Sequence, residues 1–187
     1  MSADDQFLKM PPAAQDDKAK ASKAEAPEGS IEQKIKELQY VHVDDQPEIL
    51  DTVGGDLKND LGMDKRLGTA QSAEGMINVI KSLLDVGKRL DLILSDRSFY
   101  LYEDDDVAED GAAEKKFLPA LEGLANDPKY TEALKNVAVI MNSAMDPNDF
   151  QKLQKRFPRV IGWIPKNSEK STAENLKSLI TKRVEKK

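Results

Sequence analysis

The chain has 187 residues, of which 39% are hydrophobic and 33% are charged, and its formal net charge at pH 7 is −6. This length suits one domain of ordinary size with a tail, and the acidic balance disfavours a protein that coats nucleic acid. The absence of cysteine excludes disulfides, thiolate metal sites and cysteine nucleophiles. The chain begins without the pattern of a signal peptide, and its apolar runs fall short of the ~20 residues of a membrane span. We therefore expect a cytoplasmic protein without membrane contact.

The N-terminal segment, residues 1–35, is expected to be a disordered tail or linker. Up to about residue 30 it consists almost entirely of Ala, Lys, Asp, Glu, Pro, Gln and Ser. Such a composition cannot bury enough apolar surface to order the chain. Apolar residues at 31, 35 and 38 allow a short helix that leads into a folded domain over residues 36–187.

Short apolar runs alternate with amphipathic stretches along the rest of the chain. Strands are expected at 40–43, 66–71, 90–95, 136–141 and 160–164, and helices at 48–61, 73–84, 112–125, 147–156 and 172–184. The repeated alternation of strand and helix predicts an α/β fold, with a doubly wound parallel sheet and helices on both faces.

Polar side chains stand where the expected strands end. Asp44 and Asp45 follow the first strand, and Asp96 follows the third. Ser143 follows the fourth strand and Lys166 the fifth. In open parallel sheets the site lies outside the carboxyl ends of the strands, so we expect these five side chains to converge.

This set of residues suits phosphoryl transfer. Clustered carboxylates repel one another unless a cation lies among them, and Mg²⁺ accepts one or two carboxylates together with phosphate oxygens. A carboxylate can also act as a nucleophile on phosphorus, while Mg²⁺ and a lysine neutralise the charge of the phosphoryl oxygens. A serine hydroxyl can donate a hydrogen bond to one of those oxygens.

Four segments, VHVDDQ, DLILSD, VIMNSA and WIPK, occur in that order and together resemble the receiver domain of response regulators in two-component signal transduction. The resemblance covers roughly residues 39–185. It implies a flavodoxin-like (βα)5 fold with strand order 2-1-3-4-5 and Mg²⁺ as cofactor. It also implies a signalling role, in which the domain catalyses only its own phosphorylation and dephosphorylation.

The resemblance also implies a role for each site residue. The expected assignments are Asp96 as phosphoacceptor, Asp44, Asp45, Asp96 and the main-chain carbonyl of Ser98 as metal ligands, Ser143 and Lys166 as catalytic residues, and Ser143 and Trp163 as switch residues.

A receiver of this kind is expected to take its phosphoryl group from a sensor histidine kinase or a phosphotransfer protein and to act on a downstream protein target. Because the chain ends shortly after Lys166, we expect a single-domain receiver that signals without direct DNA binding. The stretch from Asp96 to Ser143 is longer than usual for the family, which predicts an insertion at about residues 97–110.

Other interpretations remain open. The altered sequence after Asp96 allows a receiver-like interaction module that is not phosphorylated. A haloacid-dehalogenase-type phosphatase would need a second aspartate where Ser98 stands, and a flavodoxin-type cofactor binder would need a glycine-rich loop after the first strand. A further alternative is that Asp44 and Asp45 cap a helix that begins near Pro47. His42, the one histidine, is expected to pack inside the sheet.

Overall fold

A computed structural model describes residues 29–184 of the chain. At its centre is a five-stranded parallel sheet with the strand order β2-β1-β3-β4-β5. The strands are β1 (Tyr40–Val43), β2 (Arg66–Ala70), β3 (Leu92–Ser95), β4 (Ala138–Ser143) and β5 (Val160–Pro165). The expected flavodoxin-like (βα)5 topology is confirmed. β1, β3 and β4 are buried along their whole length, as expected for the centre of a sheet that is covered on both faces.

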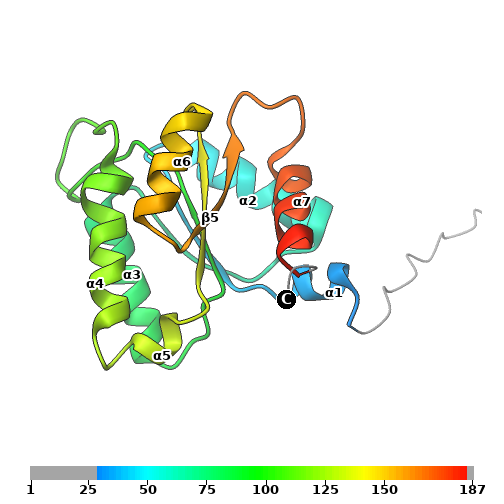
Figure 1. Cartoon of the computed structure of the whole chain (residues 1–187), viewed down its shortest axis with the longest axis horizontal. Coiled ribbons are helices and arrows are strands. Elements are labelled where there is room, and N and C mark those ends of the chain that lie inside the picture. Colours follow the sequence, from blue (N-terminus) through cyan, green and yellow to red (C-terminus); the bar gives the residue numbers. More distant parts are fainter. Residues whose placement is uncertain (1–28, 185–187) are drawn as a thin grey trace, which may run out of the picture.

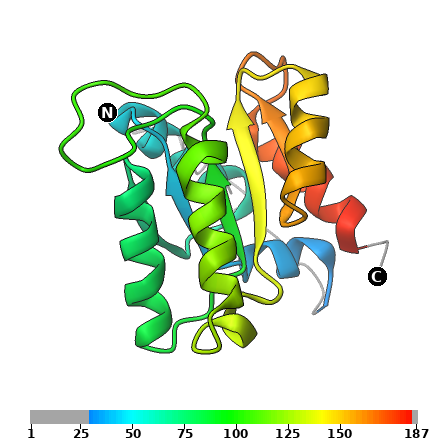
Figure 2. The same ribbon diagram turned by 60° about the vertical axis from the view of Figure 1, so that its left-hand side comes forward.

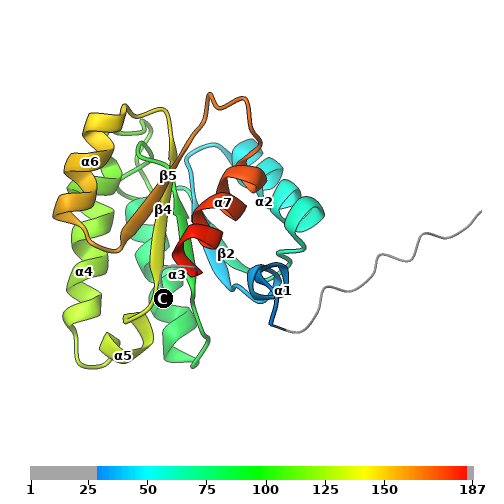
Figure 3. The same cartoon turned by 45° about the vertical axis from the view of Figure 1, so that its right-hand side comes forward.

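Helices cover both faces of the sheet (Figures 1 and 3). The helical elements are α1 (Ile31–Lys36), α2 (Pro47–Leu61), α3 (Ala73–Asp85), the π-helical turn η1 (Ala113–Phe117), α4 (Leu118–Asn126), α5 (Thr131–Leu134), α6 (Pro147–Arg156) and α7 (Thr172–Val184). α1, α2 and α7 lie on one face, and α3, α4 and α6 lie on the other. Each face buries its own hydrophobic cluster, so the sheet is the middle layer of three.

Local sequence signals explain where several helices begin. The Ser72 side chain accepts a hydrogen bond from the Gly75 amide at 2.9 Å and caps α3. Asp146 accepts hydrogen bonds from the Asn148 and Asp149 amides and caps α6. Within α2, the absence of a side chain at Gly54 leaves room for the Arg66 guanidinium, which a Cβ at this position would meet.

The connection between β3 and η1 runs from residue 96 to 112 and forms a broad loop beside the carboxyl edge of the sheet (Figure 2). Two isolated bridges hold it, one to its surroundings and one within the connection itself. Ser72 and Tyr100 form a parallel bridge beside the start of α3, and Phe99 and Glu109 form an antiparallel bridge within the connection. Phe99 is fully buried and meets the Phe117 ring edge-on, with 6.3 Å between centroids. The segment expected to be an insertion is therefore part of the packed domain.

The observed boundaries differ from the expected ones in several places. The expected tail at residues 1–35 ends inside the packed domain, because α1 begins at Ile31 and buries Ile35. Residues 1–28 lie outside the described part of the chain. β4 continues through Asn142 and Ser143, since both polar residues are buried in the sheet. The short helix α5 was not expected. Between residues 29 and 184 the structure contains no helix of the length and apolar character that a membrane span requires.

Candidate functional site

The fold brings the expected site residues together at the carboxyl edge of the sheet. Asp44 and Asp45 directly follow β1, and Asp96 directly follows β3. Ser143 is the last residue of β4, and Lys166 directly follows β5. The structure thus places these five residues at the ends of four neighbouring strands.

The three carboxylates form a compact acidic cluster. Asp44, Asp45 and Asp96 each offer an oxygen, and these oxygens all lie within 4.8 Å of one another. Asp44 and Asp96 are buried, and Asp45 is partly exposed. Burial, together with the charge of Asp44, raises the pKa of Asp45 above its ordinary value. Three oxygen ligands at this spacing, held with unfavourable mutual repulsion, fit a hard divalent cation such as Mg²⁺.

Lys166 joins two of these carboxylates. Its ammonium nitrogen lies 2.8 Å from Asp44 Oδ2 and 2.8 Å from Asp96 Oδ2. Burial alone would lower the pKa of Lys166, but its hydrogen bonds to the two aspartates outweigh that effect and raise the pKa. Lys166 therefore remains a cation between β1 and β3.

Asp96 combines burial with several hydrogen bonds. Its Oδ1 accepts a hydrogen bond of 2.6 Å from the Arg97 amide, and its Oδ2 accepts the one from Lys166. Burial raises the pKa of Asp96 despite the opposing effect of Lys166. Burial therefore makes the charged carboxylate less favourable than it is in water, and a nearby cation would oppose this effect.

Ser143 carries a hydroxyl without a hydrogen-bond partner among the described residues. Its Oγ is buried. Its carbonyl oxygen, in contrast, accepts hydrogen bonds from Trp163 Nε1 at 2.9 Å and from the Lys166 amide at 3.3 Å. An unpaired buried hydroxyl is costly, and a bound group that accepts its hydrogen bond would remove that cost.

A cavity of about 250 Å³ opens beside Asp96. The residues that line it are Asp96, Arg97, Ser98, Asp110, Ser143, Ala144, Met145 and Lys166. Two of these, Arg97 and Asp110, were not expected from the sequence. They belong to the β3–η1 connection, and nothing in the alternation of polar and apolar residues distinguishes them from its other charged residues.

The surroundings of Trp163 and of the two aspartates after β1 bear on the expected switch residue and on the alternative of helix capping. Trp163 is half-buried and packs on Phe150, with ring centroids 6.0 Å apart. The residue that caps α2 is Gln46, and its side chain makes no capping hydrogen bond. Asp44 Oδ1 accepts a hydrogen bond of 3.0 Å from the Gln46 amide. Neither Asp44 nor Asp45 is therefore the N-cap residue of α2, which leaves both available to the site.

Similarity to known proteins is found at the level of the fold. No family model matches the sequence, and no curated protein matches it. Among solved structures, the receiver domain of AraT, a response regulator from Geobacillus stearothermophilus, superposes with a TM-score of 0.52 at 15% identity, over 80% of this chain and 96% of that one. The signal receiver domain of NarL from Mycobacterium tuberculosis gives a TM-score of 0.50 at 21% identity, over 80% and 94%.

A third similar structure is longer than this chain. RcsB from Salmonella enterica serovar Typhimurium, bound to the promoter rprA in the presence of the phosphomimetic BeF₃⁻, gives a TM-score of 0.52 at 11% identity. The match covers 77% of this chain and 66% of RcsB. These likenesses, taken with the observed strand order, show that the chain has the fold of a response-regulator receiver domain.

Proposed function

We propose that the chain is a phosphorylatable receiver in which Asp96 accepts a phosphoryl group from a histidine kinase or a phosphotransfer protein. The observation that carries this proposal is the unpaired hydroxyl of Ser143. Ser143 lines the same cavity as Asp96 and Lys166, and a phosphoryl group on Asp96 would offer its buried hydroxyl an acceptor oxygen. The site thus holds a nucleophile, a cation and a free donor side by side.

The reaction is a transfer between two nucleophiles. An oxygen of the Asp96 carboxylate forms a bond to phosphorus while the bond from phosphorus to the imidazole nitrogen of the donor breaks. The electron pair of that bond returns to the imidazole, which takes up a proton from solvent. Lys166 offsets the negative charge of the phosphoryl oxygens, and Ser143 donates a hydrogen bond to one of them.

Asp44, Asp45, Asp96 and the main-chain carbonyl of Ser98 are the residues that would hold Mg²⁺. When bound there, the cation would supply the positive charge that neutralises the acids and the incoming phosphoryl group. The spacing of the three carboxylate oxygens supports this assignment. Lys166 already balances part of that charge through Asp44 and Asp96.

The signal would leave the site through Ser143 and Trp163. A Ser143 hydroxyl drawn to the phosphoryl group shifts the carbonyl of the same residue, which is the acceptor for Trp163 Nε1. Trp163 packs on Phe150 of α6, so the surface formed by β4, α6 and β5 would change with phosphorylation. We propose that this surface contacts a downstream protein target.

The test is the intact mass of the protein after incubation with acetyl phosphate and Mg²⁺. We expect one added phosphoryl group on the wild type, and none on the Asp96→Asn variant or in the presence of a chelator. Asp60→Asn, an exposed change on α2, is the matched control and should leave the adduct unchanged.

One observation favours a second candidate function. Lys166 already pairs with both buried aspartates and offsets part of their charge without a metal or a phosphoryl group. A receiver-like interaction module that is never phosphorylated would have this arrangement. The absence of any adduct on a folded wild-type protein would favour the module and contradict the phosphorylation proposal.

A further inference from the structure

The cavity beside Asp96 contains a side chain that does not come from a strand end. Asp110 lies late in the β3–η1 connection, yet it lines the same cavity as Asp96, Ser143 and Lys166. Among the residues that line this cavity, Asp110 and Asp96 are the two carboxylates. The β3–η1 connection therefore leaves the carboxyl edge of the sheet at Asp96 and brings Asp110 back to the same edge.

The backbone of Asp110 is held in place on both sides. Before it, the Glu109 amide donates a hydrogen bond of 3.0 Å to the Phe99 carbonyl, and Phe99 is anchored in the core. After it, the Ala113 amide donates a hydrogen bond of 3.1 Å to the Arg97 carbonyl. Asp110 thus lies in a turn that backbone hydrogen bonds hold on both sides, and not at the tip of the connection.

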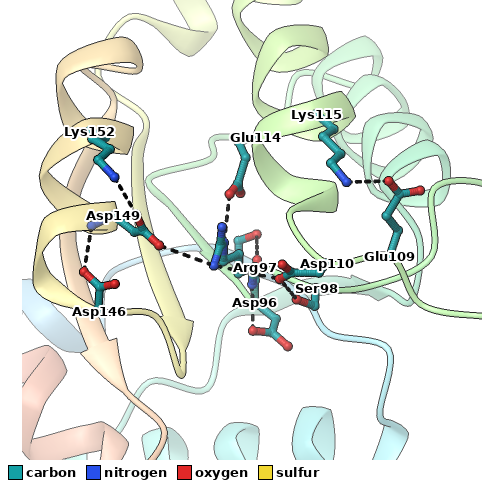
Figure 4. A network of polar contacts seen from close by, with 11 residues as sticks. Asp96, Arg97, Ser98, Glu109, Asp110, Glu114, Lys115, Asp146, Asp149 and Lys152 are labelled. Atoms are coloured by element: carbon teal, nitrogen blue, oxygen red, sulfur yellow. Dashed lines mark hydrogen bonds and ion pairs between the residues drawn. The ribbon is translucent and has the colours of Figure 1, made fainter.

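Two neighbours fix its side chain (Figure 4). Ser98 Oγ donates a hydrogen bond of 3.1 Å to Asp110 Oδ1, and Arg97 Nη1 lies 3.8 Å from the same oxygen. The Asp110 side chain is nevertheless 80% exposed, so solvent reaches it freely. A carboxylate that is oriented by the protein and open to water can accept a hydrogen bond from a water molecule in the cavity.

We propose that Asp110 orients the water molecule that hydrolyses phosphoryl-Asp96, and that it thereby sets the lifetime of the phosphorylated state. This inference rests on the proposed function of Asp96. Lys166 and Ser143 present hydrogen-bond donors, which suit phosphoryl oxygens. Directing the lone pair of a water at phosphorus requires an acceptor for the water's proton, and Asp110 supplies it.

The step is balanced without any further reactant. The water oxygen forms a bond to phosphorus while the bond between phosphorus and the Asp96 oxygen breaks, and that electron pair returns to the Asp96 carboxylate. The water's proton passes to Asp110 and then to solvent, and inorganic phosphate leaves. The Arg97 guanidinium beside Asp110 reduces the repulsion between this carboxylate and the phosphoryl oxygens.

The experiment compares phosphoryl lifetimes in the wild type and the Asp110→Asn variant. Asparagine has the same shape and still accepts a hydrogen bond from Ser98, but it is a poor acceptor for the water's proton. Both proteins are phosphorylated with acetyl phosphate and Mg²⁺, freed of excess reagent, and followed by intact mass. We expect the half-life of the phosphorylated form to lengthen about tenfold or more in Asp110→Asn.

Asp104→Asn is the matched control. It removes the same charge from an exposed position of the same connection, and Asp104 does not line the cavity. The half-life of this variant should equal that of the wild type. A second readout compares the rate of hydrolysis of phosphoryl-Asp96 in H₂O and in D₂O. We expect D₂O to slow the wild type more than Asp110→Asn, because the variant has lost the proton transfer to Asp110.

An equal or shorter half-life in Asp110→Asn overturns the inference while the phosphoacceptor role of Asp96 stands. A lengthened half-life in Asp104→Asn as well also overturns it, because the effect would then come from net charge. The absence of an adduct on the wild type contradicts the proposed function itself, and the inference falls with it.

Discussion

His42 is an unusual residue because it is buried with both ring nitrogens unpaired. It lies in the middle of β1, is fully inaccessible to solvent, and neither Nδ1 nor Nε2 has a hydrogen-bond partner among the described residues. Burial, aided by the charges of Arg66 and Lys166, lowers its pKa from 6.5 to about 3. The imidazole is therefore neutral in the folded protein, as expected for a histidine packed inside the sheet.

The stability of the fold should depend on pH through His42. Between pH 6.5 and about 3 the unfolded chain binds a proton at this residue and the folded protein does not, so acid favours unfolding in this window. From pH 7 to pH 5 we expect the wild type to lose about 2 kcal/mol more free energy of unfolding than His42→Leu. Urea denaturation at the two pH values measures the difference, and identical losses would show that His42 is not responsible.

Trp163 offers a reporter for the proposed switch because it is the single tryptophan of the chain. Its Nε1 donates to the carbonyl of Ser143, so a movement of Ser143 should alter its fluorescence. We expect BeF₃⁻ with Mg²⁺ to shift the emission of the wild type and to leave that of Ser143→Ala nearly unchanged. An equal shift in both proteins would separate Trp163 from the Ser143 hydroxyl.

At the scale of elements, Arg97 connects three parts of the structure (Figure 4). Its Nε lies 2.8 Å from Glu114 Oε1 in η1, and its Nη1 lies 3.8 Å from Asp110 and 3.9 Å from Asp149 of α6. The Glu114 contact is the strongest, since it is the shortest and the most shielded, and it is the first cause of the raised pKa of Arg97. Arg97 thus fastens the end of β3 to the beginning of the next helix.

Loss of Arg97 should destabilise the fold mainly through Glu114, whose Oε2 is already buried without a hydrogen-bond partner in the described part of the chain. We expect Arg97→Ala to cost about 1–3 kcal/mol, because it leaves a half-buried carboxylate unpaired. A double-mutant cycle with Glu114→Ala should recover about 1 kcal/mol of coupling. The corresponding cycle with Asp149→Ala is the control and should give less than about 0.5 kcal/mol after solvent screening. Equal coupling in the two cycles would contradict this ranking.

Most of the elements could be predicted from the sequence because their patterns are local. The all-buried run at β1 and the amphipathic spacing of α3 were matched within a residue at each end. β4 was placed two residues too early, because Asn142 and Ser143 are polar and nothing local indicates that the sheet buries them. The apolar spacing at residues 31, 35 and 38 indicated the short helix α1, but not that Ile35 is buried against distant partners in the core.

The site residues, too, were predictable where the sheet topology places them and not where an irregular connection does. Asp44, Asp96 and Lys166 were predicted to meet because strand ends of a parallel sheet converge by topology alone, and the hydrogen bonds of Lys166 confirm it. Asp110 was not predicted, because its position depends on the bridge between Phe99 and Glu109. Pairings inside an irregular connection have no period that the sequence reveals.

At the scale of the whole molecule, metal binding should stabilise the fold. A cation that binds the acidic cluster only in the folded state shifts the unfolding equilibrium by mass action, by about 1.4 kcal/mol at a concentration tenfold above its dissociation constant. We expect Mg²⁺ to raise the melting temperature of the wild type, and Asp45→Asn to reduce this effect strongly. Asp45 is the suitable position, because Lys166 pairs with the other two acids and not with this one.

Asp60→Asn serves again as the control, since it removes one exposed acid far along α2. Its response to Mg²⁺ should match that of the wild type. Equal Mg²⁺ responses in the wild type and Asp45→Asn would exclude Asp45 as a ligand and leave general charge screening as the cause.

The bridge between Phe99 and Glu109 divides the β3–η1 connection into an anchored base and a more exposed tip at residues 103–107. The base holds Asp110 beside Asp96, whereas the tip carries an acidic run and the exposed Val107. Changes in the length or sequence of the tip would therefore leave the spacing of the two carboxylates intact. Such a division means that the tip can change its shape and charge without moving the side chains at the strand ends.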